Sequence, residues 1–228
     1  MRIISSVVIG AMVAAWISAS AIHAAEDKLV YADFERIEDN RPVSNQGGLI
    51  QLFGYQESAS HKSTFKGVDG ANPPTPELVR IKKDDPNRAA KFDYNLLAPN
   101  AYTGVVLEIH GRPDADGRAV ADDVSAYKTL LMDVYATGVD AMRIEIVSHG
   151  FGMELQSGYP QITFKVQPGM HTYKALLKAF EQPSWQDVHL DSRKLLKNLT
   201  SVNLSAFCDQ CEINKMGVVV VDNVVFEK

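Results

Sequence analysis

Apolar and polar residues alternate along most of the chain after residue 28, which is the pattern of β-strands with one buried face. Turn sequences rich in glycine, proline and aspartate separate the alternating runs, as at 112–117 and 167–169. About ten runs joined by short links predict an antiparallel β-sandwich, because no helical pattern alternates with them. The predicted strands cover 29–34, 47–53, 78–82, 103–110, 127–136, 140–148, 161–167, 171–180, 200–207 and 216–226.

The first and last of these runs look like partners in a sheet. The first ends at Phe34 and is followed by Glu35, and the last carries Asp222 between two apolar stretches. Two strand-like ends with a carboxylate beside the apolar residues predict a closed β unit, in which the first strand lies near the last.

Three segments depart from the strand pattern. Residues 191–199 predict a short helix, with Asp191 or Ser192 as its N-cap and leucines facing the sheet. Residues 67–77 form a proline-rich loop and 84–88 a charged turn. Such loops either carry function or are plain surface excursions, and the sequence leaves both readings open.

The N-terminus has the pattern of a secretory signal peptide. A basic start at Met1-Arg2 precedes an apolar stretch that is short for a membrane span, and small residues follow it up to Ala24. We therefore predict a signal peptide at 1–24 and a single exported domain at 25–228, periplasmic or extracellular and bacterial in style. The alternative is an uncleaved membrane anchor. No second apolar run of membrane length follows, so we expect no membrane span once the signal peptide is removed.

Net charge and cysteine content narrow the classes of partner. The chain has 23 basic and 28 acidic residues, a net charge of −5, which argues against a nucleic-acid partner. Its only cysteines, Cys208 and Cys211, are predicted to form a small disulfide in an exported chain. Reduced thiols and a redox pair are the alternatives, and no second Cys/His pair completes a zinc site.

Four segments in order resemble the galactose-binding-like jelly-roll superfamily, which holds many carbohydrate-binding modules. They are 31–35 (YADFE), 123–136 (DVSAYKTLLMDVYA), 180–185 (FEQPSW) and 221–226 (VDNVVF). The resemblance implies an all-β, antiparallel jelly-roll β-sandwich with one short helix. It is less specific for function, because this fold serves lectin-like modules, assembly factors and enzyme appendages.

The same resemblance implies a structural calcium ion. In many members of the superfamily, carboxylates of the opening and closing strands bind Ca²⁺, and the matching positions are Glu35 and Asp222, with Asp33 as a further candidate. A hard cation that joins the two ends would stabilise the fold. The alternative is that these are ordinary carboxylates at strand ends.

Alternation also predicts a polar face on the middle strands. Glu108, Arg143, Glu145 and Tyr135 are expected together on one sheet face, with Trp185 at its rim. Tyr55 and Tyr159 are alternative aromatic platforms. Such a mixture suits sugars, because aromatic faces contact the C–H side of a pyranose ring and charged or amide groups bind its hydroxyls. The alternative is a plain solvated face.

Motifs of catalysis are lacking. The chain has no G-x-S-x-G elbow, no H-E-x-x-H pair and no phosphate-binding glycine loop. We therefore predict a non-catalytic carbohydrate-binding domain. The first alternative is a protein-interaction or assembly factor of the cell envelope, and the second is a small polysaccharide hydrolase or lyase that uses Glu108 and Glu145.

Overall fold

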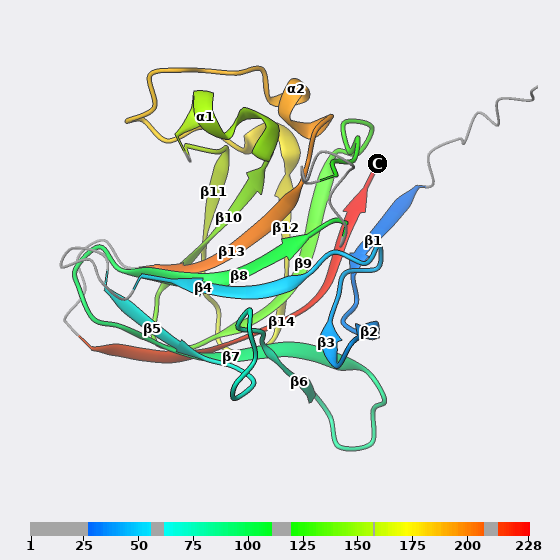
Figure 1. The fold of residues 1–228 in the computed structure, drawn as a ribbon, viewed down its shortest axis with the longest axis vertical. Coiled ribbons are helices and arrows are strands. Elements are labelled where there is room, and N and C mark those ends of the chain that lie inside the picture. The colour runs from blue at the N-terminus through cyan, green and yellow to red at the C-terminus, as the bar shows by residue number, and fades with distance from the viewer. Residues whose placement is uncertain (1–26, 56–61, 111–119, 157, 208–213) are drawn as a thin grey trace, which may run out of the picture.

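The computed structural model describes residues 27–55, 62–110, 120–156, 158–207 and 214–228, which form two antiparallel sheets packed face to face (Figure 1). The larger sheet has seven strands in the order β12-β9-β14-β7-β5, with β1 also pairing β14 and β6 also pairing β7. Its strands are β1 (Lys28–Ala32), β5 (Ser63–Lys66), β6 (Glu77–Arg80), β7 (Arg88–Leu96), β9 (Thr129–Ala136), β12 (His171–Leu176) and β14 (Lys215–Glu227).

The smaller sheet has five strands in the order β11-β10-β13-β8-β4. They are β4 (Ile50–Gly54), β8 (Tyr102–Glu108), β10 (Ala141–Val147), β11 (Gln161–Lys165) and β13 (Ser201–Phe207). The remaining elements are the two-stranded pair β2 (Ile37–Glu38) and β3 (Arg41–Pro42), the helices α1 (Gly152–Leu155) and α2 (Ser192–Leu196), and the 3₁₀ turns η1 (His149–Phe151) and η2 (Leu177–Ala179).

The core fills the space between the sheets and follows from strict alternation. In β10, Met142, Ile144 and Ile146 are buried, whereas Arg143 and Glu145 on the opposite side are only half-buried. The same rule gives β7 its inward Phe92 and Tyr94. Burial of one face on every long strand supplies the main stabilising free energy of a sandwich.

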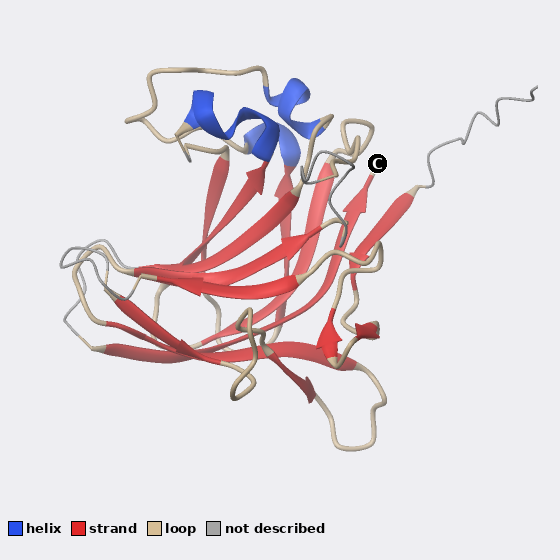
Figure 2. Ribbon diagram, viewed as in Figure 1, coloured by secondary structure: helices blue, strands red, loops and turns tan. Residues whose placement is uncertain are grey.

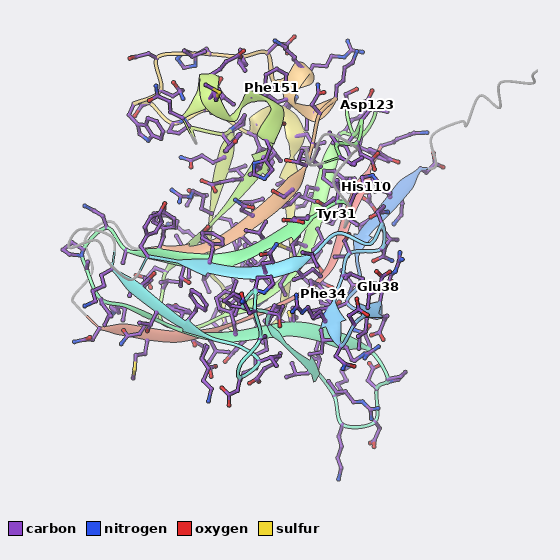
Figure 3. The ribbon with its side chains drawn as sticks, viewed as in Figure 1. Tyr31, Phe34, Glu38, His110, Asp123 and Phe151 are labelled. Carbon is purple, nitrogen blue, oxygen red and sulfur yellow. The ribbon has the colours of Figure 1, made fainter. Side chains whose placement is uncertain are left out.

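The two ends of the chain pair as predicted. In β14, Val219–Val221 lie against β7, and Val224–Glu227 lie against β1, so the last strand joins two shorter neighbours along one side. The register of β14 against β9 shifts between Asp222 and Val225, and Asn223 has a positive φ of 49°. This bulge lies where β14 passes from β7 to β1. Tyr31 and Phe34, labelled in Figure 3, are fully buried next to this joint.

All ten predicted strand runs contain a strand of the structure, and the predicted short helix is α2, capped by the Asp191 side chain, which accepts from Arg193 N at 2.9 Å. The prediction omits β7, the nine-residue strand between β14 and β5, together with β5 itself and the short strands β2 and β3. The predicted signal peptide at 1–24 and both cysteines, Cys208 and Cys211, lie outside the described residues. No helix in the described ranges is long and apolar enough to cross a membrane.

Both sheets bend in the same direction. In Figure 1, β10 and β11 stand steeply against β8 and β4, so the outer side of the five-stranded sheet lies inside the bend. The helices gather beyond one end of the sheets (Figure 2). Val147, at the end of β10, packs with Leu155, Tyr159 and Leu195, which closes that end of the outer side with a small second core.

Candidate functional site

The outer side of the five-stranded sheet carries the predicted charged residues. We call it the concave face, defined by residues Gln51, Phe53, Tyr102, Glu108, Arg143, Glu145, Asn203, Ser205 and Phe207. Arg143 is paired with Ser205, Glu145 with Asn203 and Glu108 with Ser201 in the β-ladders. The prediction that Glu108, Arg143 and Glu145 share one face is therefore confirmed.

Aromatic rings surround the guanidinium group of Arg143. The Cζ atom lies 5.3 Å from the ring centre of Tyr102 and 5.4 Å from that of Phe207, within the range of cation–π attraction. Tyr102 also packs edge-on against Tyr55 and Phe53, with ring centres 5.0 Å and 6.2 Å apart. The result is an aromatic floor around a cation that is only 20% exposed.

Amides and carboxylates form the adjoining part of the concave face. Asn203 Nδ2 donates to Glu145 at 3.4 Å, and Gln51 Nε2 donates to Glu108 at 3.0 Å. Glu145 also lies 3.4 Å from Arg143 Nε, although that contact lacks hydrogen-bond geometry. These side chains come from four adjacent strands, and such strands lie about 4.8 Å apart. The polar groups therefore extend across the sheet and not along one strand.

Two polar atoms under this face have no hydrogen-bond partner among the described residues. They are Arg143 Nε and Ser205 Oγ, which are paired across β10 and β13. A buried polar group without a hydrogen-bond partner carries a free-energy penalty, so this cross-strand pair is the least satisfied polar spot of the five-stranded sheet among the described residues.

Burial shifts the acid–base behaviour of the concave face. Burial raises the pKa of Glu108, although the backbone contact at Leu49 acts in the opposite sense. Burial, followed by the hydrogen bond with Tyr55, raises the pKa of Tyr102 far above its ordinary value. Burial and the nearby charge of Glu145 raise the pKa of Tyr159. The tyrosines are therefore neutral hydroxyl donors and acceptors at physiological pH.

Tyr135 is not part of this face, and the prediction that placed it there is wrong. It lies on β9 in the seven-stranded sheet, where it is paired with Val220 of β14. Its side chain points to the outer side of that sheet, since Val134 and Ala136 on either side of it are buried. Alternation gives the facing of a residue within its own strand but not the sheet to which the strand belongs.

Trp185 lies in the loop between η2 and α2 and is 62% exposed, so it is not a core residue. One of its ring carbons, Cη2, lies 3.0 Å from the position that a Cβ on Gly158 would take. The next residue, Tyr159, is close enough to Glu145 for its charge to act on the tyrosine. Trp185 is thus near the end of the concave face that α1 closes.

Several residues of the concave face are absent from the sequence prediction. Tyr102 and Phe207 stand at strand ends, where alternation gives little weight to a single aromatic residue, and they are paired with each other across β8 and β13. Asn203, Ser205 and Phe207 are alternate residues of one strand, so the sequence alone could have placed Asn203 on the same face as the other two. The register that brings Tyr102, Phe207 and Arg143 together is not encoded locally.

The predicted calcium ligands are already engaged with protein groups. Glu35 accepts hydrogen bonds from the backbone and the guanidinium group of Arg88, at 2.5 Å and 3.1 Å. Asp222, 1% exposed, accepts from Asn87 at 2.7 Å and from Asn223 N at 2.8 Å. Burial raises the pKa of Asp222, and these two hydrogen bonds oppose that effect.

Asp33, the third predicted ligand, accepts from Asn45 Nδ2 and from Glu35 N within a local turn. Within the described ranges, no three His, Cys, Asp or Glu side chains are grouped closely enough to hold a metal ion. At Glu35 the positive charge next to the carboxylate is that of Arg88. Calcium binding stays a prediction, and its test is given below.

A larger polar hollow of about 810 Å³ lies beside β2 and β3, near Glu38 and His110 in Figure 3. Most of its charged groups have partners: Arg36 contacts Glu38 and the Asn45 carbonyl, Arg41 donates to the Asn72 carbonyl, and His110 lies 3.2 Å from Asp122. Gln46 Oε1 in this lining is buried without a hydrogen-bond partner among the described residues. Unlike the concave face, the described lining of this hollow holds no phenylalanine, tyrosine or tryptophan.

Two solved structures that resemble this fold are carbohydrate-binding modules. The family 11 carbohydrate-binding module of the cellulosomal cellulase Lic26A-Cel5E of Clostridium thermocellum matches with a TM-score of 0.52 and 16% sequence identity, over 88% of this chain and 94% of that one. The family 11 module from Clostridium thermocellum in complex with a β-1,3-1,4-mixed-linked tetrasaccharide matches with the same TM-score and identity, over 88% and 95%.

No protein-family model matches the chain, and no curated protein matches it by sequence. At 16% identity the structural likeness shows the fold. The predicted jelly-roll β-sandwich of the kind found in carbohydrate-binding modules is thereby confirmed.

Proposed function

We propose that this chain is an exported, non-catalytic domain that binds a carbohydrate chain on its concave face. The observation that carries the proposal is the pair of rings, Tyr102 and Phe207, around Arg143, with Tyr55 packed on Tyr102. Hydrogen-bonded amides and carboxylates adjoin this cluster. Sugar rings pack their C–H faces on aromatic side chains, and their hydroxyls both donate and accept hydrogen bonds. The concave face supplies aromatic rings for the C–H faces, and donors and acceptors for the hydroxyl groups.

The charges on the face favour a neutral sugar. Two carboxylates, Glu108 and Glu145, stand against one guanidinium group, and Glu145 lies beside that group. A uronic acid would bring its carboxylate close to Glu108 without a free cation to pair it, which costs free energy. The fold shared with carbohydrate-binding modules supports the same class of ligand.

The hydrogen bonds of Glu108 and Glu145 suit residues that bind a sugar without cleaving it. Each accepts a hydrogen bond from an amide, Glu108 from Gln51 and Glu145 from Asn203, and these contacts hold them as acceptors for hydroxyl groups. In the enzyme alternative one would act as a general acid. Hydrolysis or elimination of a bound oligosaccharide that is lost in both Glu108→Gln and Glu145→Gln, in folded protein, would favour that alternative.

The test is binding of the full chain to an array of neutral and acidic glycans, followed by calorimetry on the hits. We expect a neutral oligosaccharide to bind, and Tyr102→Ala to weaken it. Tyr135→Ala, which removes a half-buried tyrosine from the other sheet, is the matched control and should bind normally. Absence of any glycan hit, together with stoichiometric capture of one envelope protein, would replace the proposal by the assembly-factor alternative.

A further inference from the structure

A second pocket, of about 380 Å³, lies far along the fold from the aromatic cluster, where α2 meets the seven-stranded sheet. Three segments line it: the turn before β9, the junction of β12 with η2, and α2 itself. Asp123, labelled in Figure 3, precedes the first of these segments. No part of the carbohydrate proposal uses this pocket.

The surface inside the pocket is aliphatic. Leu177 and Leu196 are buried at 2% and 7% exposure and form its floor, whereas Leu176 is 44% exposed at its wall. Tyr127 adds one aromatic ring, which packs on Phe226 of the core. The hydroxyls of Ser125 and Ser192 are the uncharged polar side chains of the lining besides Tyr127. An exposed leucine on a pocket wall is a site where an apolar ligand removes surface from water.

The rim of the pocket is positively charged. Lys128, Lys178 and Arg193 line it, all three are exposed, and none forms an ion pair with another described residue. Two acids adjoin the lining. Asp123 has its pKa lowered first by its hydrogen bond with Ser125 and also by the charges of Lys197 and Arg193, and Asp191 accepts a hydrogen bond from Arg193 N as the cap of α2. Three cations against these two engaged carboxylates leave a net positive rim on a chain whose net charge is −5.

We infer that this pocket binds a linear carboxylate with an aliphatic chain, of the size of a medium-chain fatty acid. The leucines take the chain, and the cationic rim takes the carboxylate. A volume of about 380 Å³ falls in the lower range of small-ligand sites, which suits one such molecule.

The lining argues against other ligands. A sugar needs an exposed aromatic platform and several hydrogen-bonding side chains, whereas this lining is mostly leucine. A peptide would bring backbone N–H and C=O groups into a pocket whose uncharged polar lining consists of two serines and one tyrosine, too few partners for a peptide backbone. An aliphatic carboxylate leaves no buried polar group unpaired.

Calorimetric titration of the full chain with sodium dodecanoate, below its micelle concentration, tests the inference, and dodecanol is the matched uncharged probe. We expect one saturable site for dodecanoate and binding at least about tenfold weaker for dodecanol. The affinity for dodecanoate should fall as salt is added, because the rim charges are exposed. Equal binding of both probes, or no saturable binding of dodecanoate, would overturn the inference.

Variants locate the site. Lys128→Gln combined with Lys178→Gln should weaken dodecanoate binding about five- to tenfold, and Leu176→Asn should weaken it by a similar factor. Lys165→Gln, which removes an exposed lysine at the far end of β11, is the control and should change nothing. Unaltered binding in the pocket variants, or occupation of the pocket by an acidic peptide in place of dodecanoate, would contradict the inference.

Discussion

The two outer faces of the sandwich obey the same alternation and yet differ in chemistry. On the seven-stranded sheet, Lys91 contacts Glu77 at 3.6 Å and Asp93 at 3.3 Å, an arrangement of long side chains at the surface. On the concave face, Arg143 is enclosed by two aromatic rings and is only 20% exposed. Lys91 is 29% exposed and pairs with carboxylates that are 42% and 47% exposed, whereas the neighbours of Arg143 are aromatic rings and Glu145, which is 16% exposed.

This difference shows what distinguishes a candidate binding face from ordinary surface. Exposed ion pairs contribute little to the free energy of folding, because water screens both charges and the side chains lose conformational entropy. A shielded guanidinium group over aromatic rings holds its geometry before a ligand arrives, so less ordering is needed on binding. Tyr102 and Phe207 provide that shielding, on the face that the bend of the sheets leaves on its inner side.

The largest effect is expected from removing the central cation of the concave face. Arg143→Met keeps the aliphatic stem between Tyr102 and Phe207 but removes the charge and its hydrogen-bond donors. We expect carbohydrate affinity to fall about thirtyfold to a hundredfold, as for a central contact residue of an interface. Lys91→Met makes the same change on the other face and should leave affinity unaltered. Equal losses in both variants by calorimetry would erase the distinction between the faces.

The second-largest effect is expected where β8 and β13, two neighbouring strands of the concave face, approach each other most closely. A Cβ on Gly104 would lie 2.1 Å from the carbonyl oxygen of Leu204, so Gly104→Ala forces β8 away from β13. We expect the free energy of unfolding to fall by about 2 kcal/mol, with a parallel loss of carbohydrate binding. Gly150→Ala is the control, because nothing lies within 4 Å of its Cβ position. Urea unfolding measures both, and a fully stable Gly104→Ala would show that the sheet adapts freely.

A smaller effect is expected at the joint between the chain ends. Arg88→Met removes the guanidinium contacts to Glu35, and we expect the free energy of unfolding to fall by about 1 kcal/mol. Lys82→Met removes an exposed cation near the same turn and serves as the control. The calcium prediction is tested on the unaltered chain, whose melting temperature should fall by several degrees when a chelator is added. An unchanged melting temperature would reject a structural calcium ion.

The smallest effect is a dependence of stability on pH. Burial raises the pKa of Glu108, so the folded state takes up a proton more readily than the unfolded state. The contribution of Glu108 is therefore most favourable at low pH and declines as pH rises from the ordinary glutamate pKa through the raised folded value. Glu108→Gln should flatten that decline in urea unfolding measured at several pH values. An unchanged pH profile would contradict the assignment of the shift to Glu108.

Much of the fold is predictable because alternation is local. The ten runs and the pairing of the chain ends follow from which residues are apolar, and the Asp191 cap follows from its position before the leucines. The omitted strand β7 has the same alternation, but two adjacent alanines, an aspartate and an asparagine lower its strand propensity. Its place between β14 and β5 is fixed by tertiary packing, which overrides propensity.

The site is only half predictable for the same physical reason. Parity within β8 and β10 places Glu108, Arg143 and Glu145 on one face, whereas the choice of sheet for β9 depends on long-range pairing and moves Tyr135 to the opposite side. The contact of Arg143 with Tyr102 and Phe207 depends on the register of three strands. Register is set by the whole sheet and by its turns, so no single strand reveals it.

The most direct test of the two-face distinction is a backbone NMR titration of the full chain with a neutral oligosaccharide from the array. We predict that the amide signals that move belong to the concave face, with the largest shifts around Tyr102, Arg143 and Asn203, and that those around Tyr135 and Lys91 stay in place. Shifts centred on Tyr135 and Lys91, with the concave face unmoved, would contradict the account.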